Sequence, residues 1–136
     1  MRILSIDYGE RRTGLAITDE LGITAQGLDT VIASSEEDAF KKVVEIVRKY
    51  GVGKILLGLP LNMNGTESEK SGKVRLFGEA LSLETSLPVV YWDERMTSMQ
   101  AHRVMAELET KTFGNKHIVD RISATLMLQE YMKMLS

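Results

Sequence analysis

Three strand-like segments follow one another near the start of this chain, and no helical pattern separates them. The first covers residues 3–6 and leads into an Asp-Tyr-Gly turn, and the next two cover residues 14–18 and 28–33. Strands joined by short turns pair as antiparallel neighbours, because a parallel connection needs about a dozen residues or more. The sequence therefore predicts an antiparallel meander of three strands.

Three later segments carry the signature of a helix start, a Ser or Thr followed three residues later by Glu or Gln. These capping pairs are Ser34 with Glu37, Thr66 with Glu69, and Thr97 with Gln100. Apolar residues at helical spacing follow each pair, and Gly51 is expected to end the first helix. A loop over residues 110–116 and a final helix over residues 118–134 are expected after them.

Two further strands are predicted between the helices, over residues 54–57 and 89–92. A strand, helix, strand connection places its strands parallel in one sheet. The expected fold class is therefore α/β, with a five-stranded mixed sheet in which two parallel strands join the meander and helices flank the sheet. No linker or repeat divides the chain, so residues 1–136 are expected to form one domain.

Composition excludes several classes of protein. The hydrophobic fraction of 43% and the charged fraction of 26% are typical of a globular protein, and no apolar run is long enough for a membrane span. The chain has no cysteine, which suits the cytoplasm and leaves only oxygen or histidine ligands for a metal ion. A net charge of −2 argues against binding nucleic acid through a general basic excess.

Four acidic residues fall where the predicted strands and the last helix deliver their ends. Asp7 closes the first strand, Asp93 and Glu94 follow the last strand, and Asp120 begins the final helix. Carboxylates that converge repel one another unless a cation neutralises them, and oxygen ligands favour Mg²⁺ or Mn²⁺. One or two such ions could support hydrolysis at phosphorus. Each acid alone could equally be a turn or helix-start residue.

Four motifs in this order resemble those of the YqgF family, also called RuvX. They are DYGERRTGLA at residues 7–16, GLPLNMNGT at 58–66, DERMTS at 93–98, and the segment from 116 to 131. The chain departs from the family pattern at Arg11, Thr13, Asn64 and Ser123. None of these four residues is a candidate catalytic acid.

The resemblance implies a ribonuclease H-like fold related to RuvC-type Holliday junction resolvases. It also implies a nuclease that matures the 5′ end of pre-16S ribosomal RNA, with Asp7, Glu94 and Asp120 as the metal-binding catalytic acids. The alternative within the same class is a resolvase that cuts branched DNA. A resolvase would work as a twofold dimer, whereas an RNA-processing nuclease can work as a monomer.

Basic and polar residues beside these acids are the candidates for substrate binding. Arg11, Arg12 and Arg95 could hold phosphates through forked hydrogen bonds, and Asn62 and Lys116 are weaker candidates. The expected partner is structured RNA or branched DNA, and no membrane is expected. Each arginine could instead pair with a nearby acid.

Two readings of other classes stay open. The strand, Asp-x-Gly and hairpin opening also occurs in ATP-using enzymes of the actin and sugar-kinase class. Those enzymes close two such domains around a cleft, and 136 residues supply only one. The second reading is a non-catalytic nucleic-acid-binding module that keeps the fold without turnover.

Overall fold

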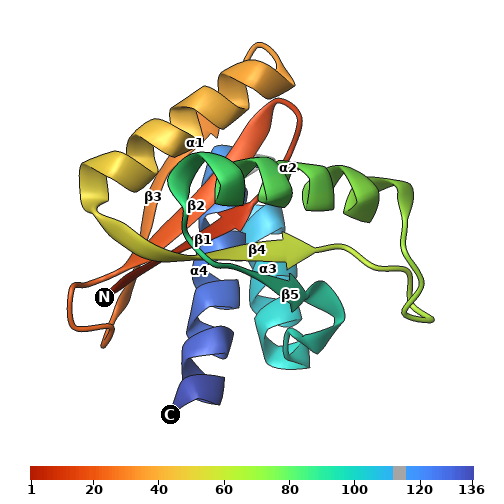
Figure 1. The fold of residues 1–136 in the computed structure, drawn as a ribbon. Coiled ribbons are helices and arrows are strands. Elements are labelled where there is room, and N and C mark those ends of the chain that lie inside the picture. Colours follow the sequence, from red (N-terminus) through yellow and green to blue (C-terminus); the bar gives the residue numbers. More distant parts are fainter. Residues whose placement is uncertain (112–115) are drawn as a thin grey trace.

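A single five-stranded sheet, in the order β3-β2-β1-β4-β5, forms the centre of the molecule (Figure 1). The computed structural model describes residues 1–111 and 116–136. The strands are β1 (Arg2–Asp7), β2 (Arg12–Thr18), β3 (Ala25–Ile32), β4 (Val52–Leu59) and β5 (Val89–Asp93). β1, β2 and β3 pair antiparallel, while β1, β4 and β5 run parallel. The predicted meander with two added parallel strands is confirmed.

The register of the parallel strands brings three chain segments to one edge of the sheet. Ile6 pairs with Leu57, and Leu59 pairs with Asp93. The carboxyl ends of β1, β4 and β5 therefore lie side by side, which is where ligands gather in open α/β sheets. Asp7, Gly58 and the Asp93–Glu94 pair therefore all lie at this edge.

Helices cover both faces of the sheet, with α1 and α2 on one face and α4 on the other (Figure 1). They are α1 (Glu36–Tyr50), α2 (Glu69–Thr85), the short 3₁₀ helix η1 (Glu94–Met96), α3 (Met99–Lys111) and α4 (Lys116–Leu135). None of the described helices is long and apolar enough to cross a membrane. The loop predicted over residues 110–116 falls mostly on residues 112–115, which lie outside the described part of the chain.

All three predicted helix caps are wrong by one or two residues. At the start of α3, the Ser98 hydroxyl, rather than that of Thr97, accepts a hydrogen bond from the Ala101 backbone. The side chain of Ser35, rather than Ser34, accepts a hydrogen bond from the Asp38 backbone at the start of α1. Ser68 forms a reciprocal capping box with Ser71 at the start of α2. Thr66 is instead engaged within the preceding loop, where its backbone N–H and its hydroxyl both donate to Asn64.

The alternation of β1 decides which of its side chains meet α4. Leu4 and Ile6 are buried in the core under α1 and α2, whereas Ile3 packs in the second core against α4. Ser5 points to the same side as Ile3, and its hydroxyl donates to the backbone carbonyl of Ala124 at 2.8 Å. Asp7, two residues further on, therefore points toward α4 as well.

The second core, between the sheet and α4, also contains the only tryptophan. Trp92 is buried and meets Tyr131 edge to face, with ring centroids 6.1 Å apart. Its side chain therefore packs in the core.

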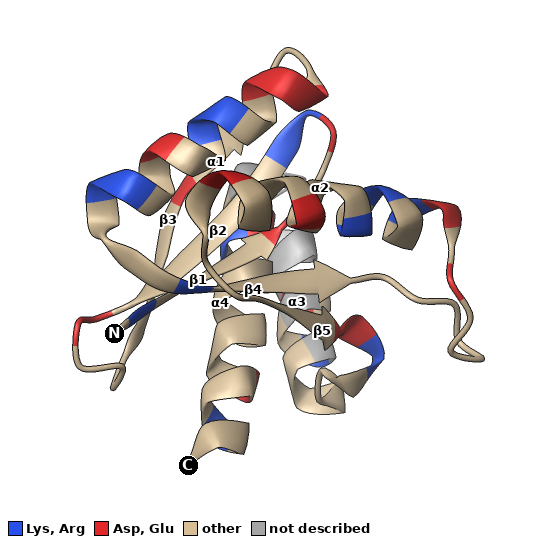
Figure 2. Ribbon diagram, in the orientation of Figure 1, with Lys and Arg blue, Asp and Glu red and all other residues tan. Residues whose placement is uncertain are grey.

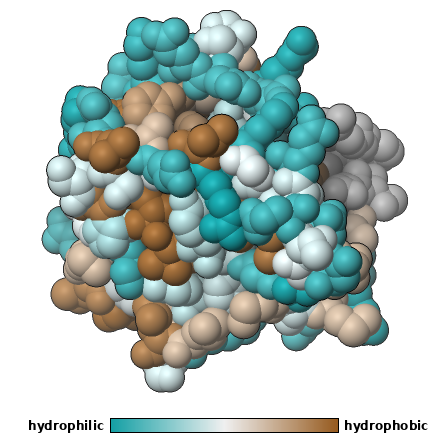
Figure 3. Space-filling view, turned by 45° about the vertical axis from the view of Figure 1, so that its right-hand side comes forward, coloured by the Kyte–Doolittle hydropathy of each residue, from teal (hydrophilic) through white to brown (hydrophobic). Residues whose placement is uncertain are grey.

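Charged residues of both signs are interspersed over the molecule (Figure 2). In the view of Figure 3, hydrophilic residues dominate the middle and right of the face, and hydrophobic residues gather at its left. In the view of Figure 2 the basic residues of the described chain are therefore not gathered into one patch.

Candidate active site

Asp7, the last residue of β1, is the central acid of the site. Burial raises the pKa of its carboxyl group, and the negative charge of Asp120 raises it further. The cation of Lys70 and a hydrogen bond with the Ser123 side chain act in the opposite direction. Asp7 therefore lies among groups from α2 and α4 that change the pKa of its carboxyl group.

Glu94 approaches Asp7 from the end of β5. It is the first residue of η1, and its side chain lies over Gly58 of β4, where an added Cβ atom would be 2.9 Å from Oε1 of Glu94. Burial raises the pKa of Glu94 to about 7, and the charges of Asp7 and Asp93 also raise it against the lowering effect of Lys70. The absence of a side chain at Gly58 leaves room for this buried carboxylate.

Asp120 approaches Asp7 from the other side. Gly14 of β2 pairs with Asp7 across the sheet, and a Cβ atom on Gly14 would overlap the backbone carbonyl of Asp120. Nε of Arg12 donates to Oδ2 of Asp120 at 3.0 Å. The first turns of α4 are thus packed directly on β2 and held there by an ion pair.

The charge of Asp120 consequently raises the pKa of Asp7, and the charge of Asp7 in turn raises the pKa of Glu94. Among the described residues, however, no three Asp, Glu or His side chains are grouped tightly enough to hold a single metal ion. The three acids form two neighbouring pairs that share Asp7, rather than a ready-made cage. Carboxylate oxygens fit a hard divalent cation, and such a cation would relieve the repulsion that helps to raise the pKa values of Asp7 and Glu94.

Arg95 is engaged within the protein. Its guanidinium group forms a forked ion pair with Asp93, in which Nη2 lies 2.6 Å from Oδ2, and Nη1 donates to the carbonyl of Met63 at 3.2 Å. Gly65 packs against the same guanidinium group. Arg95 and Asp93 therefore connect the end of β5 to the loop that follows β4. The carboxylate of Asp93 is paired with Arg95.

The remaining substrate-binding candidates differ in whether their side chains are already engaged in hydrogen bonds or ion pairs. Both hydrogen bonds that the Asn62 amide group donates stay within its own loop, to Thr66 and to the Glu67 carbonyl. Arg12 is paired with Asp120, whereas Arg11 is exposed, and no ion pair holds it among the described residues. The side chain of Lys116 lies outside the described part of the structure.

Comparison with known families identifies the family to which the chain belongs. The sequence profile of the RuvX family, described as Holliday junction resolvase, matches residues 1–134. The chain belongs to the RuvX family. This confirms the family suggested by the four motifs, and with it the prediction of a nuclease.

Curated relatives of this RuvX chain match almost its whole length. A protein of Clostridium novyi is 43% identical over 132 residues, covering 97% of this chain and 98% of the relative. A protein of Pelotomaculum thermopropionicum is 38% identical over 133 residues, covering 97% and 86%. Both are named "Putative pre-16S rRNA nuclease".

Solved structures confirm the ribonuclease H-like fold. Thermus thermophilus RuvC in complex with a Holliday junction substrate superposes with a TM-score of 0.61 at 18% identity, covering 98% of this chain and 96% of that one. The fowlpox virus Holliday junction resolvase gives 0.62 at 14% identity and covers both chains fully. At such identities the likeness concerns the fold.

Two residues of the site were not found from the sequence. Ser123 entered the sequence analysis only as a departure from the family pattern, yet its side chain forms a hydrogen bond with Asp7. That departure was the available signal in the sequence. Lys70 could not be predicted as a residue of the site, because nothing in its local sequence shows that the first turn of α2 lies near Asp7 and Glu94.

Proposed function

We propose that this RuvX chain is a metal-dependent endonuclease that matures the 5′ end of pre-16S ribosomal RNA. The observation that carries the proposal is the position of Asp7, whose charge is coupled to Glu94 from β5 and to Asp120 from α4. Nucleases of mixed α/β folds use such acids at the carboxyl ends of parallel strands. A cytoplasmic location follows from this role.

The donor chemistry of the site supports Mg²⁺ or Mn²⁺. Asp7 and Glu94 would hold one ion between them, and Asp120 would be a further ligand, either to that ion or to a second one. A divalent ion bound there would polarise the phosphate and lower the pKa of the attacking water.

In the reaction, a water oxygen forms a new bond to phosphorus and one P–O ester bond breaks. The leaving oxygen takes a proton, so that one strand ends in a hydroxyl group and the other in a phosphate monoester. Asp7 and Glu94 provide the anionic binding surface, and the ion pair of Arg12 with Asp120 keeps α4 in place beside them.

The natural substrate is inferred from the relatives. Relatives of 38–43% identity over nearly the whole chain carry the ribosomal RNA name, whereas the structural neighbours that act on junctions are at most 18% identical. This favours structured RNA. The family description keeps branched DNA as the second candidate substrate.

The test is cleavage of labelled pre-16S RNA and of a four-way DNA junction, each with Mg²⁺, Mn²⁺ or a chelator. The Asp7→Asn and Glu94→Gln variants should lose metal-dependent cutting. Asp29→Asn is the matched control, because Asp29 is fully exposed and, among the described residues, forms an ion pair only with Arg121 at the surface.

The preferred substrate decides between ribosomal RNA maturation and junction resolution. Cutting that persists in Asp7→Asn would show that the activity resides elsewhere. Binding without cutting under every metal would identify a non-catalytic nucleic-acid-binding module.

A further inference from the structure

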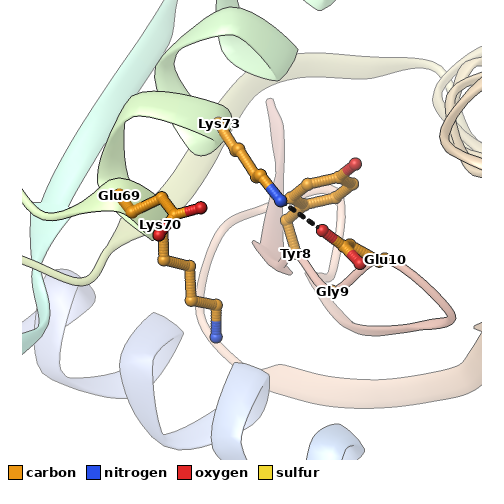
Figure 4. Close-up of a pocket in the computed structure, with 6 residues that line it drawn as sticks. All are labelled: Tyr8, Gly9, Glu10, Glu69, Lys70 and Lys73. Atoms are coloured by element: carbon orange, nitrogen blue, oxygen red, sulfur yellow. Dashed lines mark hydrogen bonds and ion pairs between the residues drawn. The ribbon is translucent and has the colours of Figure 1, made fainter.

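A cavity of about 310 Å³ lies between the β1–β2 loop and the first turn of α2 (Figure 4). It begins at Tyr8, the residue that follows Asp7. Its lining residues are Tyr8, Gly9, Glu10, Glu69, Lys70 and Lys73. Two cations, Lys70 and Lys73, therefore line a cavity that begins one residue beyond Asp7.

The two lysines of the cavity are in different electrostatic situations. Lys73 forms an ion pair with Glu10, drawn as a dashed line in Figure 4. Lys70 is exposed, its ammonium group points away from that pair, and within the described part of the chain it has no ion-pair partner within 4.0 Å. Only Lys70 thus offers an uncommitted positive charge to a ligand in this cavity.

The free ammonium group faces the site. The charge of Lys70 acts on Asp7 and on Glu94, and for each of them it is the largest influence that favours the ionised form. It nevertheless stands off from both carboxylates, since it forms an ion pair with neither. The space between the cation and the two anions is the place that a ligand carrying both an anionic group and a bound cation would fill.

A phosphodiester bound through a divalent ion at Asp7 and Glu94 is such a ligand. Its remaining anionic oxygen needs a cation on the side away from the acids. Arg12 and Arg95 are committed to Asp120 and Asp93. We propose that Lys70, which lines the cavity next to Tyr8, binds the phosphate group at which the substrate is cut.

This assignment rests on the proposed nuclease function and adds a catalytic residue to it. As water attacks, negative charge builds up on the phosphate oxygens, and an ammonium group already in place stabilises that charge without transferring a proton. Lys70 also helps to explain how a chain of net charge −2 can bind a phosphate backbone.

The experiment compares Lys70→Ala, Lys70→Arg and Lys73→Ala with the parent in single-turnover cleavage of pre-16S RNA. Lys73→Ala is the matched control, since Lys73 lines the same cavity but is paired. Lys70→Ala should slow cleavage by about 10-fold or more. The loss should stay smaller than the roughly 10²- to 10³-fold expected for a fully buried donor, because Lys70 is exposed. Lys70→Arg should restore part of the rate, and Lys73→Ala should stay near the parent.

A second readout separates a phosphate contact from a merely structural role. Removing a positive charge near a cation site strengthens cation binding, so Lys70→Ala should need less Mg²⁺ for half-maximal rate while its maximal rate falls. An unchanged rate, or equal losses in the two alanine variants, would overturn the assignment. An unchanged melting temperature in Lys70→Ala shows that the variant is folded.

RNA binding, measured with Ca²⁺ in place of Mg²⁺ and as a function of salt, tests Lys70 independently of turnover. Loss of one phosphate contact should weaken binding and reduce the salt dependence by about one counterion in Lys70→Ala but not in Lys73→Ala. If the parent cuts no substrate, the proposed function fails, and this measurement alone decides whether Lys70 contacts phosphate. Equal binding by parent and Lys70→Ala would refute that contact.

Discussion

The backbone of Asp120 packs directly on Gly14, the residue of β2 that pairs with Asp7. No side chain separates α4 from the sheet at this point. A strand residue and a helix residue more than 100 positions apart in the sequence are thereby brought to the same edge. The close approach explains in physical terms why position 14 of the first motif holds a glycine.

Gly14→Ala should destabilise the protein and reduce cleavage. The added methyl group would overlap the Asp120 carbonyl, which belongs to a helix backbone and cannot swing away. Overpacking of this kind costs about 1–3 kcal/mol. Urea unfolding measures the change. Gly72→Ala is the control, because Gly72 lies in α2 with open space around its Cβ position, and there alanine should stabilise by about 0.5–1 kcal/mol. Equal stability of parent and Gly14→Ala would show that α4 can move aside.

The raised pKa of Glu94 predicts that stability without metal decreases as pH rises. The ordinary pKa of its carboxyl group is 4.5, and in the folded protein it is about 7. The folded state therefore binds this proton more tightly than the unfolded state does. The corresponding stability is present below pH 4.5 and is lost as pH rises through 7, with an upper limit on the order of 3 kcal/mol.

Melting temperatures measured in chelator between pH 5 and 8 test this expectation. The decline with pH should be shallower in Glu94→Gln, which cannot ionise. It should also be shallower in the parent with Mg²⁺, because a bound cation favours the ionised acid. Groups of lowered pKa, such as Asp93, titrate below pH 4 and do not affect this window. A parent curve that is parallel to that of Glu94→Gln would contradict the coupling.

Most of the fold could be predicted from periodicity and turn residues. Strand order, strand direction and the shared edge of Asp7 and Glu94 follow from local patterns and from the geometry of strand, helix, strand connections. The exact caps could not. Ser34 and Ser35 are neighbours with equal capping chemistry, and Ser34 instead binds the Asp38 side chain through its backbone and its hydroxyl.

The contacts that the charged and polar side chains form could not be predicted from the sequence. Arg12, Arg95 and Asn62 have the chemistry to bind phosphate, yet each is drawn into a contact that depends on distant segments or on loop shape. The ion pair of Arg12 joins residues 108 positions apart. Such pairing depends on three-dimensional packing, which periodicity does not encode.

Ser123→Ala should weaken metal binding without unfolding the protein. The Ser123 hydroxyl stabilises the ionised form of Asp7, and a hydrogen bond to a charged group contributes about 1.5–3 kcal/mol. The Mg²⁺ concentration for half-maximal cleavage should rise by about tenfold or more. Thr125→Val is the control, since the Thr125 hydroxyl donates to the Arg121 carbonyl of its own helix. The same metal dependence in both variants would deny Ser123 a role at Asp7.

Arg95→Ala should loosen the loop after β4 rather than simply weaken substrate binding. Arg95 connects Asp93 to the Met63 carbonyl. Its loss removes this connection and leaves bonds within the loop, such as that between the Asn62 N–H and the Thr66 carbonyl at 2.9 Å. Amide hydrogen exchange over residues 62–66 should accelerate in Arg95→Ala and remain at the parent rate in Arg11→Ala, because Arg11 is exposed. Arg95→Lys should not restore protection, since an ammonium group cannot form the forked pair with Asp93. Unchanged exchange accompanied by weaker RNA binding would instead assign Arg95 to the substrate, as its chemistry alone suggests.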